Sequence, residues 1–191
     1  MDLLLIENQS FKKENFNEEK FPVAHYENCT FEGCDFSNQS FSEAKFEECT
    51  FSNCDLSLVN LTNTVLQEVI FDHCKMLGLH FDSCNQFLLH LKFGNCNLSN
   101  SVFYQLPLKN IRFESCNLTE VDFSESILEK ASFNHSNLSG ATFDHTNLRG
   151  ADLSTAENVF LDPNANQIQG AKFSKENALN LLEKFRIEIL H

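Results

Sequence analysis

The chain has 191 residues, enough for one domain of ordinary size, and carries a formal net charge of −13 with a pI of about 4.8. Its arginines (Arg112, Arg149 and Arg186) are widely separated, so we do not expect direct binding to nucleic acid or anionic lipid through a basic patch. No apolar run approaches the roughly 18 residues of a membrane helix, and the first residues lack the basic segment of a signal peptide, so we expect a cytoplasmic protein with no membrane association.

A period of five residues organises most of the sequence. In residues 141–153, ATFDHTNLRGADL, a large apolar residue recurs at every fifth position, and a small residue stands two positions before each one. One register of these large residues, called centres below, runs from Phe11 to Phe81, and a second register, shifted by two, runs from Leu88 to Leu153. A period of five fits neither a helix nor a flat strand, so we predict a chain that turns a corner every five residues.

Four such repeats close a coil of twenty residues, which predicts an all-β solenoid. Each centre and the small residue two before it point inward, as strand periodicity requires, and the other three positions face solvent. Stacked coils pair through backbone hydrogen bonds about 4.8 Å apart, so about seven coils predict a rod of roughly 34 Å.

The cysteines follow the same period. Each stands at the small inward position, where a thiol behaves as a small buried hydrophobe, and we find no CxxC pair or Cys/His cluster at zinc spacing. We therefore expect core thiols and no metal or cofactor. The eight positions are Cys29, Cys34, Cys49, Cys54, Cys74, Cys84, Cys96 and Cys116.

Along the chain, we predict the solenoid over residues 1–173, with a phase shift of two residues at about 82–92. Phe87, Leu89 and Leu91 give this segment an apolar character. Two interpretations stay open: a bulge that widens one corner, or an exposed patch that contacts a partner.

The sequence of residues 174–191 predicts a different structure, a short helix followed by a strand. Ser174 is the expected N-cap of the helix, Leu179, Leu182 and Phe185 form its apolar stripe, and the ending RIEILH alternates like a strand, with Ile187 and Ile189 on one face.

The repeat resembles that of the pentapeptide-repeat proteins, whose pattern is A(D/N)LXX and whose fold is a right-handed quadrilateral β-helix. The resemblance covers roughly residues 9–155. The tail, LDPN…IQGAKFS, then a helix, then FRIEIL, resembles the C-terminal module of the Qnr-type quinolone-resistance proteins, MfpA and the microcin B17 immunity protein. In these proteins the module joins two β-helices end to end, which implies a homodimer here through Leu179, Leu182, Phe185, Ile187 and Ile189. Some Qnr proteins also carry longer loops, to which only the phase shift corresponds.

This resemblance implies a partner, DNA gyrase and by extension topoisomerase IV, and a role as a DNA mimic that protects the enzyme from quinolones or a natural poison. The acidic side chains that stack at twenty-residue spacing are the candidate contacts. They form three ladders: Asp35 and Asp55; Glu47, Glu48 and Glu68, with Glu27; and Asp82, Asp122, Glu125 and Asp144.

Two alternatives to the DNA-mimic interpretation remain from the sequence. In the first, the acidic surface serves only solubility. In the second, the chain is a structural adaptor that binds another protein partner. We find no catalytic constellation, because no histidine lies within reach of a nucleophile by repeat geometry and no Gly-rich phosphate loop is present, and we expect no enzyme.

Overall fold

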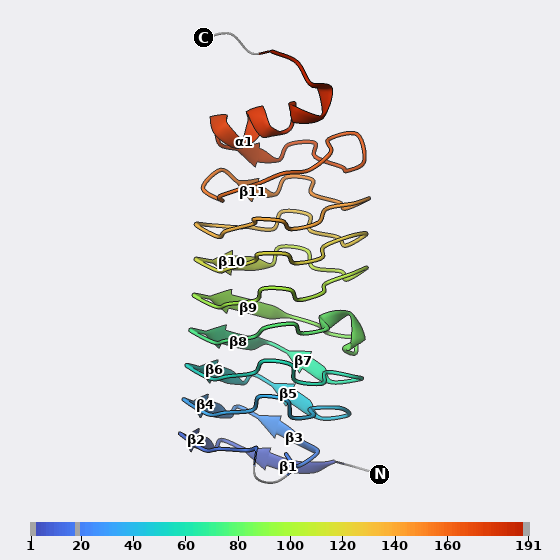
Figure 1. The fold of residues 1–191 in the computed structure, drawn as a ribbon. Helices are drawn as coiled ribbons and strands as arrows, with labels where there is room; N and C mark the ends of the chain where they lie inside the picture. Colours follow the sequence, from blue (N-terminus) through green and yellow to red (C-terminus); the bar gives the residue numbers. More distant parts are fainter. Residues whose placement is uncertain (1–2, 18–19, 189–191) are drawn as a thin grey trace.

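The chain forms a right-handed, four-sided β-solenoid of about eight turns, with one short helix at its C-terminal end (Figure 1). This computed structural model describes residues 3–17 and 20–188. The fold predicted from the five-residue period is confirmed, with about one turn more than predicted. Eight turns at about 4.8 Å give a rod of roughly 38 Å.

Two neighbouring sides of the rod carry parallel β-sheets, called the first and second sheet sides. The first sheet holds β1 (Leu4–Glu7), β3 (Ala24–Glu27), β5 (Lys45–Glu47) and β7 (Val65–Gln67). The second holds β2 (Ser10–Lys12), β4 (Thr30–Glu32), β6 (Thr50–Ser52), β8 (Val69–Asp72), β9 (Leu91–Gly94) and β10 (Arg112–Glu114), with β11 (Asp152–Leu153) and β12 (Lys172–Phe173) as a separate pair further along. Partners stand twenty residues apart, as in Phe31 and Phe51, because each coil repeats the register of the previous one, and only the pair β8 and β9 departs from this spacing among the described strands.

The other two sides, called the first and second turn sides, are built from tight turns joined by isolated bridges. On the first turn side, Asp35 bridges Asp55, and on the second, Val102 bridges Asp122. The centres beneath these sides are Phe36, Leu56, Met76, Leu98, Leu118 and Leu138 on the first, and Phe41, Leu61, Phe81, Phe103, Phe123 and Phe143 on the second.

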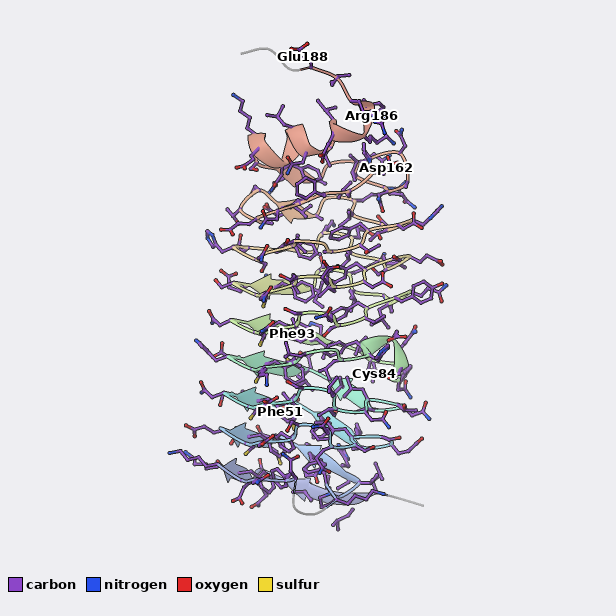
Figure 2. The ribbon with its side chains drawn as sticks, in the orientation of Figure 1. Phe51, Cys84, Phe93, Asp162, Arg186 and Glu188 are labelled. Carbon is purple, nitrogen blue, oxygen red and sulfur yellow. The ribbon has the colours of Figure 1, made fainter. Side chains whose placement is uncertain are left out.

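The core is the column of centres inside the coil, where Phe51 and Phe93 lie (Figure 2). Rings on successive turns stack, as in Phe31 and Phe51, whose centroids are 4.6 Å apart with planes at 11°. Burial of each centre stabilises the folded chain by roughly 1.5–3 kcal/mol. The centre Leu108 is smaller than the phenylalanine centres. The inward positions beside it hold Leu106 and Ile111, which are larger than the usual residues there, and this keeps the interior packed.

All eight cysteines are buried and free, as predicted. The structure adds that most of these thiols donate to backbone carbonyls: the Cys54 thiol lies 3.3 Å from the Phe31 oxygen. The hydroxyls of Thr64 and Thr146 make the same bond at the same position, at 2.9 Å. The inward position therefore favours residues that are small and can also satisfy a buried carbonyl at the corner.

The corners require left-handed backbone at the second residue after most centres. Asn28, Gly33, Asn38 and Asn53 occupy this position with φ between 49° and 65°, which Asn and Gly adopt most readily. Leu58 adopts it too, with φ of 59°, although leucine is poorly suited to it.

The phase shift is a loop at residues 85–90 on the first sheet side. Pairing resumes with Leu91 opposite Val69, twenty-two residues apart instead of twenty. Leu88, predicted as a buried centre, is 54% exposed with φ of 60°, so that prediction is wrong. Leu89 packs partly against the core instead.

The contact patch predicted in this part of the chain comprises Phe87, Leu89 and Leu91. The prediction is wrong for Leu91, because its side chain is 3% exposed and occupies an inward position of β9. Phe87 is 75% exposed, and Leu89 is half-buried. The segment is therefore an insertion of two residues that exposes the aromatic side chain of Phe87, and contact of this side chain with a partner stays a prediction.

The C-terminal helix α1 (Lys175–Asn180) closes the last coil. The Ser174 hydroxyl accepts from the Asn177 backbone N–H at 3.0 Å, which confirms the predicted N-cap. The Asn177 side chain is buried and donates to the Ala156 carbonyl at 2.7 Å, so α1 supplies a donor to the end of the solenoid. The short turn η2 (Glu183–Phe185) follows.

Residues 186–188 do not form the predicted final strand, so that prediction is wrong for them. Arg186 has left-handed backbone with φ of 50°, which directs the chain away from an extended path. Ile189 lies outside the described residues. Within the described ranges, no helix is long and apolar enough to cross a membrane.

Candidate partner-binding surfaces

The net negative charge is concentrated on the two turn sides. Up to residue 157, the described residues on these two sides include only two lysines, Lys20 and Lys75. The acidic residues on the same sides are Glu14, Asp35, Asp55, Glu120 and Glu157 on the first turn side, and Glu43, Asp82, Asp122, Glu125 and Asp144 on the second. Because the two sides adjoin, their carboxylates form one acidic half of the rod.

The two sheet sides are close to neutral by comparison. Their acidic residues are Glu7, Glu27, Glu32, Glu47, Glu48, Glu68, Asp72, Glu114, Glu129 and Asp152, and their basic residues are Lys12, Lys13, Lys45, Lys92, Lys109, Arg112, Lys130, Arg149 and Lys172. Several form ion pairs between successive turns, such as Lys109 with Glu129 at 3.0 Å. The sheet sides therefore add little to the net charge.

Asp35 and Asp55 stack on the first turn side, as predicted. Each also holds its own corner: Oδ1 of Asp35 accepts from the Ser37 N–H at 2.9 Å, and Asp55 makes the same bond to Ser57. The backbone hydrogen bond from Ser37 is the main cause of a lowered Asp35 pKa. These carboxylates thus stabilise the turns as well as charging the surface.

Asp82, Asp122, Glu125 and Asp144 share the second turn side, so the phase shift does not move this ladder to another side. Glu125 is fixed in place by its neighbours. Gln105 donates to it at 2.8 Å and Tyr104 at 3.0 Å, and these bonds, that of Gln105 first, lower the Glu125 pKa. The second turn side therefore displays several carboxylates, of which Glu125 is held in a defined position.

Glu47, Glu48 and Glu68 lie on the first sheet side, beside cations and imidazoles. Lys45 lies 2.5 Å from Glu47, and His90 lies 2.8 Å from Glu68. This predicted ladder therefore has a different environment from the acidic half and contributes less uncompensated charge.

The C-terminal end presents apolar side chains. Leu179, Phe185 and Ile187 are exposed and Leu182 is half-buried, so the predicted dimer residues within the described ranges do not pack into the core. Exposed Phe160 borders a shallow groove between the last coil and the helix. Asp162, Arg186 and Glu188 lie at the same end (Figure 2).

The family model of the pentapeptide repeat region matches residues 24–103, 66–143 and 88–173, which together span most of the chain. The chain belongs to the pentapeptide-repeat family. No curated protein sequence matches it.

Among solved structures, the fold is similar to QnrB1, described as a plasmid-mediated fluoroquinolone resistance protein. One trypsin-treated variant of QnrB1 is 20% identical with a TM-score of 0.62, and the match covers 98% of each chain. A second trypsin-treated variant is 21% identical with a TM-score of 0.57, over 100% of each chain. This likeness extends to the whole fold, including the C-terminal region.

Proposed function

We propose that this protein binds DNA gyrase, and by extension topoisomerase IV, in place of DNA and protects the enzyme from fluoroquinolones or a natural poison. It acts by binding, with no reaction of its own. The observation that carries the proposal is the acidic half of the rod, formed by the two turn sides. The whole-length similarity of fold to a fluoroquinolone resistance protein supports it.

The dimensions and charge suit a DNA-binding groove. A duplex as long as the rod, roughly 38 Å, carries roughly 22 phosphate charges, at one per about 1.7 Å. The acidic half offers fewer charges, but ordered hydrogen bonds hold several of them, including Asp122 and Glu125, in fixed positions. A basic groove would therefore attract one half of this rod and not the other.

Dimerisation through the C-terminal end is part of the proposal. Leu179 and Phe185 expose apolar surface there, and pairing with a second copy would remove it from water. Two rods end to end would measure about 76 Å. Light scattering should give a dimer for the native chain and a monomer for the double variant Leu179→Asp, Phe185→Asp, since both side chains are exposed and their loss leaves the coils intact.

A supercoiling assay tests the proposal directly. Purified protein is titrated into DNA gyrase with and without a fluoroquinolone, and the expected result is restored supercoiling in the presence of the drug. Inhibition without rescue would reduce the function to competition with DNA. No effect in either arm would overturn the proposal and favour an adaptor with another partner.

A further inference from the structure

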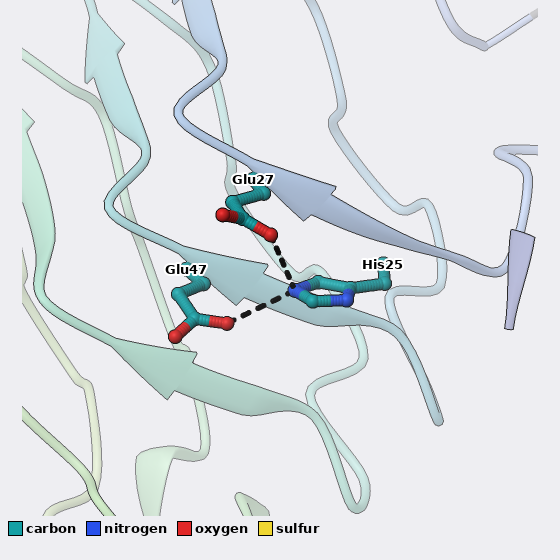
Figure 3. Close-up of side chains that lie close together, drawn as sticks. All are labelled: His25, Glu27 and Glu47. Atoms are coloured by element: carbon teal, nitrogen blue, oxygen red, sulfur yellow. Dashed lines mark hydrogen bonds and ion pairs between the residues drawn. The ribbon is translucent and has the colours of Figure 1, made fainter. Parts of the chain in front are cut away.

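The first sheet side brings an imidazole and two carboxylates together near the N-terminal end. His25 and Glu27 stand two residues apart on β3 and so project from the same face. Glu47 on β5 is in register with Glu27. The His25 Nε2 lies 3.0 Å from Oε2 of Glu47 and 3.9 Å from Oε2 of Glu27 (Figure 3). One potential ligand atom from each residue lies within 4.8 Å of the others.

The carboxylates of this column repel one another. Glu7, Glu27 and Glu47 are in register on successive strands, and like charges directly opposite across strands are destabilising. In the described ranges, Lys45 pairs with Glu47 at 2.5 Å, and no lysine or arginine pairs with Glu7 or Glu27. A cation with two charges would relieve this repulsion better than the single ammonium group does.

The three side chains have suitable chemistry, and two of them, unlike the 46% exposed Glu27, are largely shielded from solvent. Imidazole nitrogen and carboxylate oxygen are both zinc ligands, and three protein ligands with water at the fourth position form a common type of site. The side chains of His25 and Glu47 are only 21% and 24% exposed, and both are carried by paired strands, which limits their motion.

We propose that His25, Glu27 and Glu47 form a binding site for Zn²⁺ that links the second and third coils. Lys45 occupies part of the site in the metal-free protein. Its side chain is 30% exposed and can swing towards solvent when the ion enters. The ion would stabilise the N-terminal part of the rod, because it binds the folded chain in a geometry that the unfolded chain does not hold.

Calorimetric titration of the full chain with ZnCl₂, together with thermal unfolding, tests the site. The unfolding midpoint of the native chain should rise with zinc concentration. Glu47→Gln should weaken binding by at least about tenfold, since even loss of an outer hydrogen-bond partner costs 10–100-fold. Glu48→Gln, an exposed neighbour outside the cluster, is the matched control and should bind like the native chain.

Lys45→Met separates the metal site from an ion-pair network. With the competing ammonium removed, zinc should bind more tightly than to the native chain, although the metal-free variant should be no more stable. If neither the native chain nor Lys45→Met binds zinc at millimolar concentration, the proposal is overturned. It is also overturned if Glu47→Gln binds like the native chain, or if the absorption of the Co²⁺ form shows thiolate ligands, because the ion would then lie elsewhere.

Discussion

The turn sides and the sheet sides of the rod share one core and differ in what they present to solvent. Phe123 lies beneath a turn side and Phe113 beneath a sheet side, and both are fully buried. Outside, the nearest charged residues to Phe123 in the sequence are Asp122 and Glu125, whereas those nearest to Phe113 are Arg112 and Glu114. The five-residue repeat constrains the inward positions and the backbone of the corner residue, so the other outward positions of each side can acquire their own charge without a change of fold.

The largest expected effect tests whether the core is in fact shared. Phe113→Ala and Phe123→Ala should each lower the free energy of unfolding by about 3–5 kcal/mol, because each leaves a cavity between stacked rings. Denaturant unfolding measures both. If the two losses of unfolding free energy differ by more than the width of this range, the two kinds of side are stabilised differently.

The second prediction concerns the outer surface. Reversing Asp122, Glu125 and Asp144 to Lys should weaken binding to gyrase by about tenfold or more at low salt, mainly through slower association, and less so at high salt.

The matched control reverses three sheet-side acids, Glu32, Glu114 and Glu129, to Lys. This variant should bind almost like the native chain. Circular dichroism should show the solenoid in both variants. Equal losses of affinity in the two would contradict the assignment of the contact to the turn sides.

A smaller effect is expected at the corners. Leu58 has left-handed backbone on the first turn side, where Asn38 occupies the same position one turn earlier. Leu58→Asn should raise the free energy of unfolding by roughly 0.5–1 kcal/mol, since Asn tolerates this conformation better. Asn38→Leu should lower it by a similar amount. A stabilising effect of both substitutions would rule out backbone strain as the cause.

The smallest effect is pH dependence, and it should not distinguish the sides. The pKa values of Asp35 on a turn side and Asp152 on a sheet side are both lowered from 3.8, chiefly by the backbone hydrogen bond from Ser37 and by the hydroxyl of Ser154, respectively. A depressed folded-state pKa adds stability that is present above pH 3.8 and lost as pH falls through the folded value. Asp35→Asn and Asp152→Asn should each reduce this acid sensitivity, as measured by unfolding midpoints between pH 5 and pH 2.

The period alone predicted the regular coils, because a five-residue spacing of large and small residues has few other structural solutions. It failed at Leu88, where extending the second register backward from Phe93 placed a leucine in the core. Two extra residues in the loop change which leucine turns inward, and sequence spacing does not decide between Leu88 and Leu89. At Leu91 the error was different: Leu91 stands two residues before Phe93, an inward position of the second register, and its assignment to the contact patch overlooked this.

At the C-terminal end, the sequence predicted the cap at Ser174 but not the role of Asn177. A buried asparagine in a short helix gives no hydrophobic signal, and its partner Ala156 is twenty-one residues earlier. The cluster of His25, Glu27 and Glu47 was missed for a related reason. Its signal, His-x-Glu with Glu twenty residues later, becomes visible only when the sequence is written as coils of twenty.

The loop at residues 85–90 has a practical consequence for protein engineering. Leu91 resumes the ladder opposite Val69 after two extra residues, and the turns beyond it keep their regular spacing of twenty. Foreign peptides inserted beside Phe87 should therefore project from the rod while the coils on either side stay in register. The molecule would serve as a rigid carrier that displays an epitope at a fixed distance from its C-terminal end.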